Sequence, residues 1–312
     1  MRGRKMRAII TGATGTVGMA LIDELVRNEF EVLVLCRTGS RRSSNIKENS
    51  YVTKVDCSLD EMKSFVGDGK KYDYFFHLAW DGTTGATRND MHLQNKNIEY
   101  TLDAVELAAR LGCSCFIGAG SQAEYGRVEG KINGRTPAFP ENGYGIAKFA
   151  AGRMSRIMCE NLGMRHVWAR ILSVYGPYDG ARSMVMSTII ELKKGNTPKF
   201  TPGEQIWDYM YSEDAAKALL AIAENGKDGS IYCLGDGKGA MLKEYIEKIR
   251  DAVAPDAALG LGEIPYAKNQ VMYLCADISD LQRDTGFVPS ISFDEGIAKT
   301  VSWFDEFVKI YD

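Results

Sequence analysis

The sequence predicts an α/β fold, with a doubly wound parallel sheet and a smaller C-terminal lobe. Short, continuously apolar runs alternate with amphipathic helical patterns through the first half of the chain, and this alternation is typical of a parallel sheet covered by helices on both faces. The glycine-rich segment TGATGTVG, residues 11–18, separates the first apolar run from the first helical pattern. The length of 312 residues suffices for one large α/β domain with an appended part, or for two domains.

The strand patterns of the first half are expected at residues 7–12, 31–36, 51–56, 72–79, 113–119 and 165–172. The helical patterns between them are expected at residues 16–28, about 90–111 and 144–162. Right-handed crossovers between parallel strands place the carboxyl ends of the strands at one edge of the sheet, and such folds bind ligands there.

The second half is less regular and predicts a small lobe over that edge. Strands are expected at residues 207–211 and 230–235. Helices are expected at residues 184–195, 213–225 and 242–253, with Ser212 as the N-cap of the second helix. The Pro/Gly-rich segments 195–203 and 255–265 are predicted loops.

Bulk composition narrows the class of protein. A net charge of −3 gives no reason to expect nucleic acid or an anionic membrane as a partner. The seven cysteines form no CxxC pair, so we expect reduced, structural thiols and neither disulfides nor a metal site. The basic start MRGRKMRAIITG lacks the apolar run of a signal peptide, and no stretch has the length of a transmembrane helix. A cytoplasmic protein is expected.

The segment TGATGTVG has the spacing of a phosphate-binding loop. Gly12, Gly15 and Gly18 lie between a predicted strand and a predicted helix, where glycines permit a tight turn and bring backbone N–H groups against a pyrophosphate. We therefore expect a Rossmann-type dinucleotide site that includes Thr14, Thr16 and Val17. The alternative is a glycine-rich turn that binds nothing.

The end of the second strand carries no carboxylate to accept hydrogen bonds from an adenosine ribose. It has Arg37, Thr38, Ser40 and Arg41 instead, and such residues favour a 2′-phosphate. The sequence therefore favours NADP over NAD, unless this segment is only a solvated basic loop. Asp56, with Cys57 beside it, is a candidate adenine contact or a plain strand-end cap.

Three polar side chains are expected to meet where a nicotinamide would lie. Tyr144 and Lys148 are four residues apart at the start of a predicted helix, and Ser121 follows the fifth strand. Tyr144 can give a proton to a developing alkoxide, and an ammonium beside it would lower its pKa from about 10. We expect Lys148 to supply that ammonium and Ser121 to donate a hydrogen bond to the same oxygen.

The chain resembles the extended short-chain dehydrogenase/reductase family of the nucleotide-sugar epimerase/dehydratase type. The resemblance covers nearly the whole chain and is carried, in order and spacing, by TGATGTVG, HLAW (77–80), Asn97, GSQAEYG (120–126), YGIAK (144–148), RILSVYGP (170–177) and WDYMYSEDAAKA (207–218). It implies that Ser121, Tyr144 and Lys148 are the catalytic trio. It also implies a bound nucleotide-diphosphate sugar, and it places these residues on or beside the cofactor: the three loop glycines, Asp56, Leu78, Ala79, Trp80 and Asn97.

On this resemblance we expect residues 1–176 to form the dinucleotide-binding domain, to which residues 205–240 return. Residues 177–204 and 241–312 are then the substrate-binding lobe. Family members form dimers through two helices, and the helices near 91–110 and 145–161 have apolar faces that would serve a homodimer or intramolecular packing.

The residues after Ser121 discriminate among reactions. Sugar 4,6-dehydratases carry an Asp-Glu pair where this chain has Gln122 and Ala123. Glu124 is one residue late, so we expect it to turn away from the substrate, and this disfavours dehydration. The 3,5-epimerase-reductases that make GDP-fucose carry a cysteine at position 123, so that reaction is disfavoured too.

Two enzymatic alternatives remain, a 4-keto reductase and a 4-epimerase with tightly bound NAD. The expected NADP preference favours the reductase, and GAGSQAEYG with TPGEQIWDYMY resembles the CDP-abequose and CDP-paratose synthases. These enzymes reduce a CDP-4-keto-6-deoxyhexose, and dTDP sugars are the other candidate substrates. A third hypothesis is a cofactor-binding sensor without chemistry. Such relatives typically lose the tyrosine or lysine that this chain keeps.

Two residues depart from the pattern of UDP-sugar epimerases. Ser173 replaces an asparagine and Trp207 replaces an arginine, both of which contact the nucleotide diphosphate in those enzymes. Arg182 or Lys199 would have to supply the positive charge. Thr83 and Gln122 are further candidates for contact with the substrate, whereas His77 is expected to be a packing residue.

Overall fold

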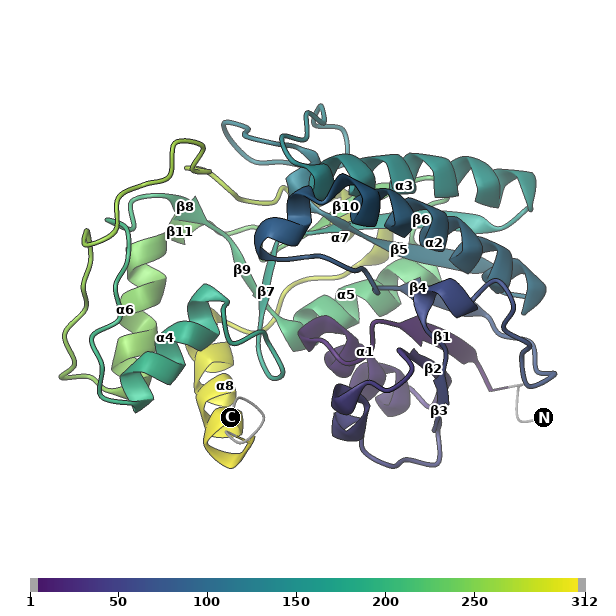
Figure 1. The fold of residues 1–312 in the computed structure, drawn as a ribbon, viewed down its shortest axis with the longest axis horizontal. Coiled ribbons are helices and arrows are strands. Elements are labelled where there is room, and N and C mark those ends of the chain that lie inside the picture. The colour runs from purple at the N-terminus through teal and green to yellow at the C-terminus, as the bar shows by residue number, and fades with distance from the viewer. Residues whose placement is uncertain (1–4, 308–312) are drawn as a thin grey trace.

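The structure, a computed structural model, describes residues 5–307. Residues 1–4 of the basic start and residues 308–312 of the predicted lobe lie outside the described part. Seven parallel strands form the central sheet in the order β10-β6-β5-β4-β1-β2-β3 (Figure 1). Their bounds are β1 Arg7–Thr11, β2 Glu31–Cys36, β3 Val52–Asp56, β4 Tyr74–His77, β5 Cys115–Ser121, β6 Arg165–Ile171 and β10 Ile231–Leu234.

The chain changes direction across the sheet between β1 and β4. From β1 it runs outward to β2 and β3, and then returns to build β4, β5 and β6 on the other side of β1. Parallel sheets bind ligands at such a switch point, beyond the carboxyl ends of the strands. The predicted doubly wound α/β fold is therefore confirmed.

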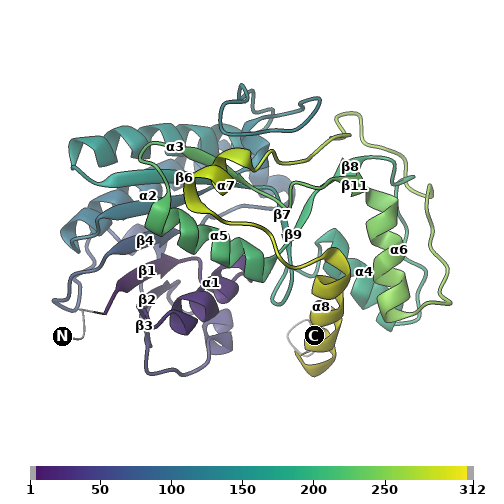
Figure 2. The ribbon, with the colours of Figure 1, turned by 180° about the vertical axis from the view of Figure 1, so that it is seen from behind.

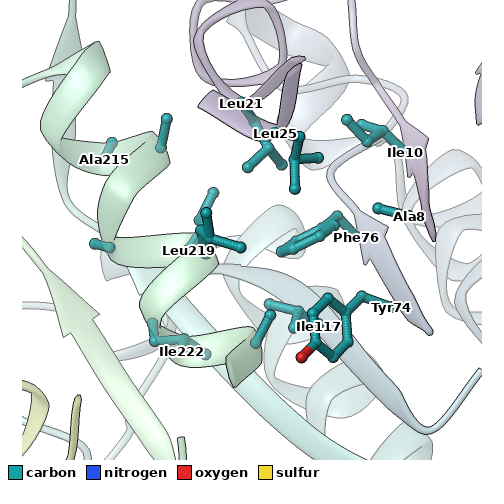
Figure 3. Packing of buried hydrophobic residues seen from close by; sticks show 14 of the residues in the cluster. Ala8, Ile10, Leu21, Leu25, Tyr74, Phe76, Ile117, Ala215, Leu219 and Ile222 are labelled. Carbon is teal, nitrogen blue, oxygen red and sulfur yellow. The ribbon is translucent and has the colours of Figure 1, made fainter. Parts of the chain in front are cut away.

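Helices cover both faces of this sheet (Figures 1 and 2). On one face α1, Thr16–Arg27, lies beside α5, Ser212–Asn225, and Leu21, Leu25 and Leu219 point toward Phe76 and Ile117 of the sheet (Figure 3). On the other face α2, Met91–Arg110, lies beside α3, Gly143–Asn161. Strand β5, which carries Ser121, is buried along its whole length.

The C-terminal lobe has a hydrophobic core of its own. The helices α4, Met184–Lys193, α6, Leu242–Val253, and α8, Phe293–Phe307, pack together at one end of the molecule (Figures 1 and 2). Two short strand pairs join this lobe to the sheet domain: β7 Ser173–Tyr175 with β9 Tyr209–Tyr211, and β8 Ile206–Trp207 with β11 Ala240–Met241. The short helices are η1 Arg41–Asn45, η2 Leu59–Glu61, η3 Gly85–Asn89, η4 Gln122–Glu124 and α7 Ser279–Thr285.

The structure corrects two local predictions. The strand expected at 207–211 is broken at Asp208, because its buried carboxylate accepts hydrogen bonds from the N–H groups of Asp236, Gly237 and Ala276 at 2.7, 3.0 and 2.9 Å. Ser212 is the first residue of α5 and not its N-cap, a position that Tyr211 occupies.

The division into two domains stays a prediction, but α7 bears on its boundary. Leu281 and Phe287 lie in the same hydrophobic cluster as α1 and α5, so this part of 241–312 packs with the sheet domain. All seven cysteines are free and buried. Among residues 5–307, no helix has the length and apolar character needed to cross a bilayer.

Candidate functional site

The glycine loop packs so closely that two of its glycines admit no side chain. A Cβ on Gly12, whose φ is +72°, would lie 2.5 Å from the Ala79 nitrogen, and one on Gly18 would lie 2.5 Å from the Gly12 carbonyl oxygen. Gly15 is different, because a Cβ there would meet only the Gly12 oxygen, at 3.9 Å. The loop therefore packs closely against the sheet, and at Gly15 it leaves free space outside the N-terminus of α1. Backbone N–H groups at a helix N-terminus with such space can bind a pyrophosphate.

Two cavities flank this loop. The first, of about 460 Å³, is lined by Gly12, Ala13, Thr14, Arg37, Ser40, Arg42, Cys57, Ser58, Asp60, Ala79, Trp80 and Asp81, among others. It matches the expected adenosine half of a dinucleotide site, with two differences. Arg42 lines it and Arg41 does not, and Cys57 lines it while Asp56 at the strand end does not. Asp60, which also lines this cavity, is a carboxylate that was not predicted here from the sequence.

The second cavity, of about 420 Å³, brings together the predicted catalytic residues. Its lining includes Gly15, Thr16, Val17, Gly18, Leu78, Trp80, Thr83, Ser121, Tyr144, Lys148 and Asp179. Gly12 and Trp80 line both cavities, so a single extended ligand can run from the basic loop to the tyrosine. This continuity suits a dinucleotide with its reactive end at Tyr144.

Tyr144 lies half-buried in a polar corner of that cavity. Burial raises the pKa of its phenol, and a hydrogen bond with the Ser121 side chain and the charge of Arg88 act in the opposite direction. Ser121 Oγ also accepts a hydrogen bond from the Ala123 nitrogen at 3.2 Å. Ser121 and Tyr144 are therefore hydrogen-bonded neighbours in this cavity.

Lys148 departs from its expected role in lowering the pKa of Tyr144. Its ammonium donates to the Ala119 carbonyl at 2.7 Å, lies 3.8 Å from the centre of the Trp80 ring, and is 5.9 Å from that of Tyr144. The pKa of Tyr144 is raised overall, and the cations that bear on it do not include Lys148. Burial lowers the pKa of Lys148 itself to about 7, against the charge of Glu124.

Glu124 faces the protein interior, as predicted. Its carboxylate accepts hydrogen bonds from the Ser121 nitrogen at 2.8 Å, Trp168 Nε1 at 2.9 Å and Arg170 Nε at 2.6 Å. Glu124 and Arg170 form a salt bridge with 1% and 3% of their side chains exposed. Glu124 therefore holds the end of β5 and has no access to the cavity.

The glycines before Ser121 make room for Trp168. A Cβ on either Gly118 or Gly120 would collide with its indole, and one on Gly152 of α3 would lie 2.7 Å from it. The GAGS segment therefore has two structural roles, because the serine lines the second cavity while the glycines admit a tryptophan from β6. The second role was not visible in the sequence, since nothing in the strand pattern shows which neighbour lies across the sheet.

His77 and Asn97 are structural in this arrangement. His77 is buried, bonds Thr11 Oγ1 through Nδ1 at 2.9 Å, and has its pKa lowered to about 3 by burial, as expected of a packing residue. Asn97 bonds both the nitrogen and the oxygen of Asp81 at 2.9 Å. Asn97 therefore fixes the backbone conformation of the loop after β4 at Asp81. Its contact with the cofactor stays a prediction.

Four of the predicted substrate residues line neither cavity: Gln122, Ser173, Arg182 and Trp207. Ser173 and Trp207, the two departures from the epimerase pattern, are bonded to each other, since Trp207 Nε1 donates to Ser173 Oγ at 2.8 Å. Arg182 is exposed, and Lys199 pairs with Glu263 at 2.9 Å. Thr83 is the one predicted substrate residue that lines the second cavity.

Two charged residues near the second cavity were not predicted from the sequence, Asp179 and Arg88. Asp179 lines the cavity, and burial raises the pKa of its carboxyl group against hydrogen bonds from Ser183 and the Gly180 nitrogen. Arg88 stacks on the ring of Tyr144, with its guanidinium carbon 4.2 Å from the ring centre. Asp179 follows the YGP segment closely enough to have been suspected, whereas Arg88 lies in the short helix η3, with no sequence signal.

Comparison with known proteins places the chain in a family. The family model described as the NAD dependent epimerase/dehydratase family matches residues 8–235. The chain belongs to this family. A putative UDP-glucose 4-epimerase of Methanocaldococcus jannaschii is 25% identical over 308 residues, which are 95% of this chain and 97% of that protein. CDP-abequose synthase of Salmonella typhimurium is 24% identical over 302 residues, with 94% and 96% covered.

Solved structures of the same type share the fold. UDP-glucose 4-epimerase of Thermotoga maritima, solved with UDP-glucose, matches with a TM-score of 0.86 at 22% identity, covering 97% of this chain and 100% of that one. The dTDP-glucose 4,6-dehydratase of Streptomyces venezuelae, solved with NAD and TYD, also gives 0.86, at 20% identity and 98% coverage of both chains. The predicted membership of the extended short-chain dehydrogenase/reductase family, of the epimerase/dehydratase type, is thereby confirmed.

Proposed function

We propose that this chain reduces the 4-keto group of a CDP- or dTDP-activated 4-keto-6-deoxyhexose with NADPH. The observation that carries the proposal is that Ser121, Tyr144 and Lys148 line one cavity with the glycine loop, while Glu124 is turned into the core. The cavity thus holds the groups for proton transfer to a ketone oxygen. The positions after Ser121 offer no acid–base pair for removing water.

The fit of the cofactor rests on the loop and the basic side chains. Gly15 leaves space outside the N-terminus of α1, and Arg37 and Arg42 line the cavity at the adenosine end. A guanidinium there would bind a 2′-phosphate through charge-assisted hydrogen bonds. This supports NADPH as the cofactor in the proposed reaction.

When bound, NADPH supplies the hydride that converts the C4 carbonyl into an alkoxide. The phenol of Tyr144 gives its proton to that alkoxide oxygen and becomes a phenolate, which takes a proton back from solvent before the next cycle. Ser121 donates a hydrogen bond to the same oxygen and holds the ketone in line. Lys148 holds the end of β5 through the Ala119 carbonyl and, because it lines the same cavity, would hold the ribose of a bound cofactor.

The test is NADPH oxidation, followed by nicotinamide absorbance, with CDP- and dTDP-4-keto-6-deoxyglucose as substrates and NADH for comparison. Loss of one NADPH per sugar reduced is expected. The matched control is Tyr144→Phe, which should lose about 10²-fold or more of the rate and still bind NADPH. Equal rates in wild type and variant, or oxidation of neither cofactor with either sugar, would reject the proposal. A sensor without chemistry would show NADPH binding and no turnover.

A 4-epimerase is the second candidate, because the relatives include UDP-glucose and UDP-N-acetylglucosamine 4-epimerases. Such an enzyme would use the same trio and return the hydride to the other face of the ketone. The proposed reductase predicts no interconversion of UDP-glucose and UDP-galactose without added cofactor. Interconversion by protein purified with NAD would favour the epimerase.

We also propose that two copies associate through α2 and α3. Ile146, Met154 and Ile157 on α3 and Met91 on α2 are large apolar side chains with 46–60% of their surface exposed. The three on α3 are spaced at intervals of eight and three residues, so they share one face of the helix. A second copy of the same helices would cover them symmetrically.

A further inference from the structure

Arg88 is held in a defined position over the catalytic tyrosine. The guanidinium carbon lies 4.2 Å from the centre of the Tyr144 ring, and Nη1 donates to the Thr83 carbonyl at 3.0 Å. The side chain is half-buried. A guanidinium at this distance from a ring face is attracted by the π-electrons, so the ring and the loop carbonyl together fix its orientation.

The loop that carries Arg88 is itself anchored on both sides. Gln94 of α2 donates from Nε2 to the Gly82 and Thr87 carbonyls, both at 2.9 Å. On the other side, the Gly143 nitrogen at the start of α3 donates to Asn89 Oδ1 at 2.9 Å. These bonds tie η3 to both helices.

The backbone of Arg88 approaches α3 closely at the residue before Tyr144. A Cβ on Gly143 would lie 3.0 Å from the Arg88 carbonyl oxygen and 2.9 Å from Met91 Sδ. Glycine at 143 is therefore what allows η3 and the first turn of α3 to touch. Because Gly143 directly precedes Tyr144, a shift of the Arg88 backbone would also shift the start of α3 and with it the Tyr144 ring.

The charge of Arg88 is not neutralised by a neighbouring acid. Within the described chain, no carboxylate lies within 4.0 Å of its guanidinium. An arginine without an acidic partner keeps its net positive charge beside the ring, and that charge is attenuated by the surrounding protein and solvent.

Four other groups bear on Tyr144 or share its cavity. Ser121 at the end of β5 forms a hydrogen bond with the phenol and lowers the pKa of Tyr144. The negative charge of Glu124 in η4 raises that pKa. Lys148 of α3 is directed to Ala119 and Trp80. Asp179 lines the cavity from the loop after β7. Arg88 is the cation that lowers the pKa of Tyr144 in this arrangement, a part that the sequence had assigned to Lys148.

We propose that Arg88 is a positioning residue that acts through Tyr144, by fixing the phenol ring against Ser121 and supplying the positive charge beside the reacting hydroxyl. The inference rests on the proposed function in one respect, that Tyr144 is the proton donor. After that donation the ring carries a negative charge inside a buried pocket, and the guanidinium stacked on it stabilises this charge. Reprotonation from solvent then completes the cycle with no change in Arg88.

The direct test is the ionisation of Tyr144 in the substrate-free protein. The tyrosines are replaced by 3-fluorotyrosine, which ionises at lower pH than tyrosine. The ¹⁹F resonance of residue 144 is assigned by its absence from Tyr144→Phe and titrated in wild type and Arg88→Gln. Removing the cation should raise the midpoint by roughly half to one pH unit. Arg153→Gln, an exposed arginine on α3, is the matched control and should titrate like wild type.

Arg88→Lys keeps the charge and should titrate nearer to wild type than Arg88→Gln does. An unchanged midpoint in Arg88→Gln, a resonance that does not titrate in either protein below the pH of unfolding, or an equal shift in Arg153→Gln would overturn the proposal. With substrate, the loss of kcat/KM at high pH should move upward in Arg88→Gln, because the phenol must stay protonated to donate.

The two proposals fail separately. If wild type oxidises no NADPH with either keto sugar but the ¹⁹F midpoint shifts, the proposed substrate is wrong and the role of Arg88 stands. If wild type turns over and the midpoint does not shift, the proposed reaction stands and the role of Arg88 is wrong.

Discussion

Replacing Glu124 with alanine should destabilise the protein more than any surface change. The variant would leave Arg170 as a charge with 3% of its side chain exposed and no acidic partner, and it would remove the acceptor for Trp168 Nε1 and the Ser121 nitrogen. Removing one partner of a buried ion pair costs about 3–5 kcal/mol. Because whole domains are stable by about 5–15 kcal/mol, this is a large fraction of the total.

The assay is urea unfolding of wild type and Glu124→Ala, followed by far-ultraviolet circular dichroism. The midpoint should fall with little change in the slope, because the surface exposed on unfolding is nearly the same. Glu141→Ala is the control, since Glu141 forms a solvent-exposed pair with Arg127 at 2.7 Å, and it should unfold close to wild type. Glu124→Leu combined with Arg170→Met should recover much of the loss, because no charge is then left buried.

The reasoning would be refuted if Glu124→Ala and Glu141→Ala had the same midpoint. That result would mean that Arg170 finds water or another acceptor when its partner is removed. A loss in Glu124→Ala that the double variant does not repair would instead assign the cost to the orphaned donors of Trp168 and Ser121.

Three further predictions concern pH, cofactor and assembly. Burial lowers the pKa of Lys148 from 10.5 to about 7. Between these two pH values the Lys148 amine is mostly protonated in the unfolded state and mostly neutral in the folded state. The free energy of unfolding therefore rises with pH across this window. The difference in unfolding free energy between wild type and Lys148→Met, measured from pH 7 to 10, should show this slope, and a flat difference would contradict it. Arg42→Gln should weaken NADPH binding by roughly tenfold and leave NADH nearly unchanged, as measured by calorimetry; equal losses would show that Arg42 does not contact the 2′-phosphate. Ile157→Glu should give a monomer by light scattering where wild type gives a dimer, and monomeric wild type would reject the proposed contact.

Much of the fold could be predicted because its signals are local. The alternation of apolar strands and amphipathic helices needs only a few neighbouring residues to be read, and the glycine loop has a spacing dictated by close backbone contact. The ends of elements were less predictable. Asp208 breaks a strand pattern because its carboxylate bonds three distant N–H groups, and nothing in WDYMY shows that these groups lie nearby.

That Ser121, Tyr144 and Lys148 line one cavity was predictable for a related reason, because a helix fixes the spacing of Tyr144 and Lys148 and a strand end fixes Ser121. The direction in which Lys148 points was not. Its ammonium goes to Ala119 and Trp80, a choice set by the loop after β4. Arg88 and Arg42 escaped prediction because they lie in the short helices η3 and η1, which span too few residues to show a periodic pattern in the sequence.

The packing around Trp168 has a consequence for how such a site can change over evolutionary time. Its indole fits among Gly118, Gly120 and Gly152, which come from a strand and a helix far apart in the chain. A larger residue at any of the three collides with the tryptophan, and a smaller residue at 168 leaves a void beneath the strand that holds Ser121. Substitutions at these four positions therefore depend on one another. A tryptophan is tolerated at 168 only when all three glycines are already present. The glycines can be replaced by larger residues only after the tryptophan has been replaced by a smaller one.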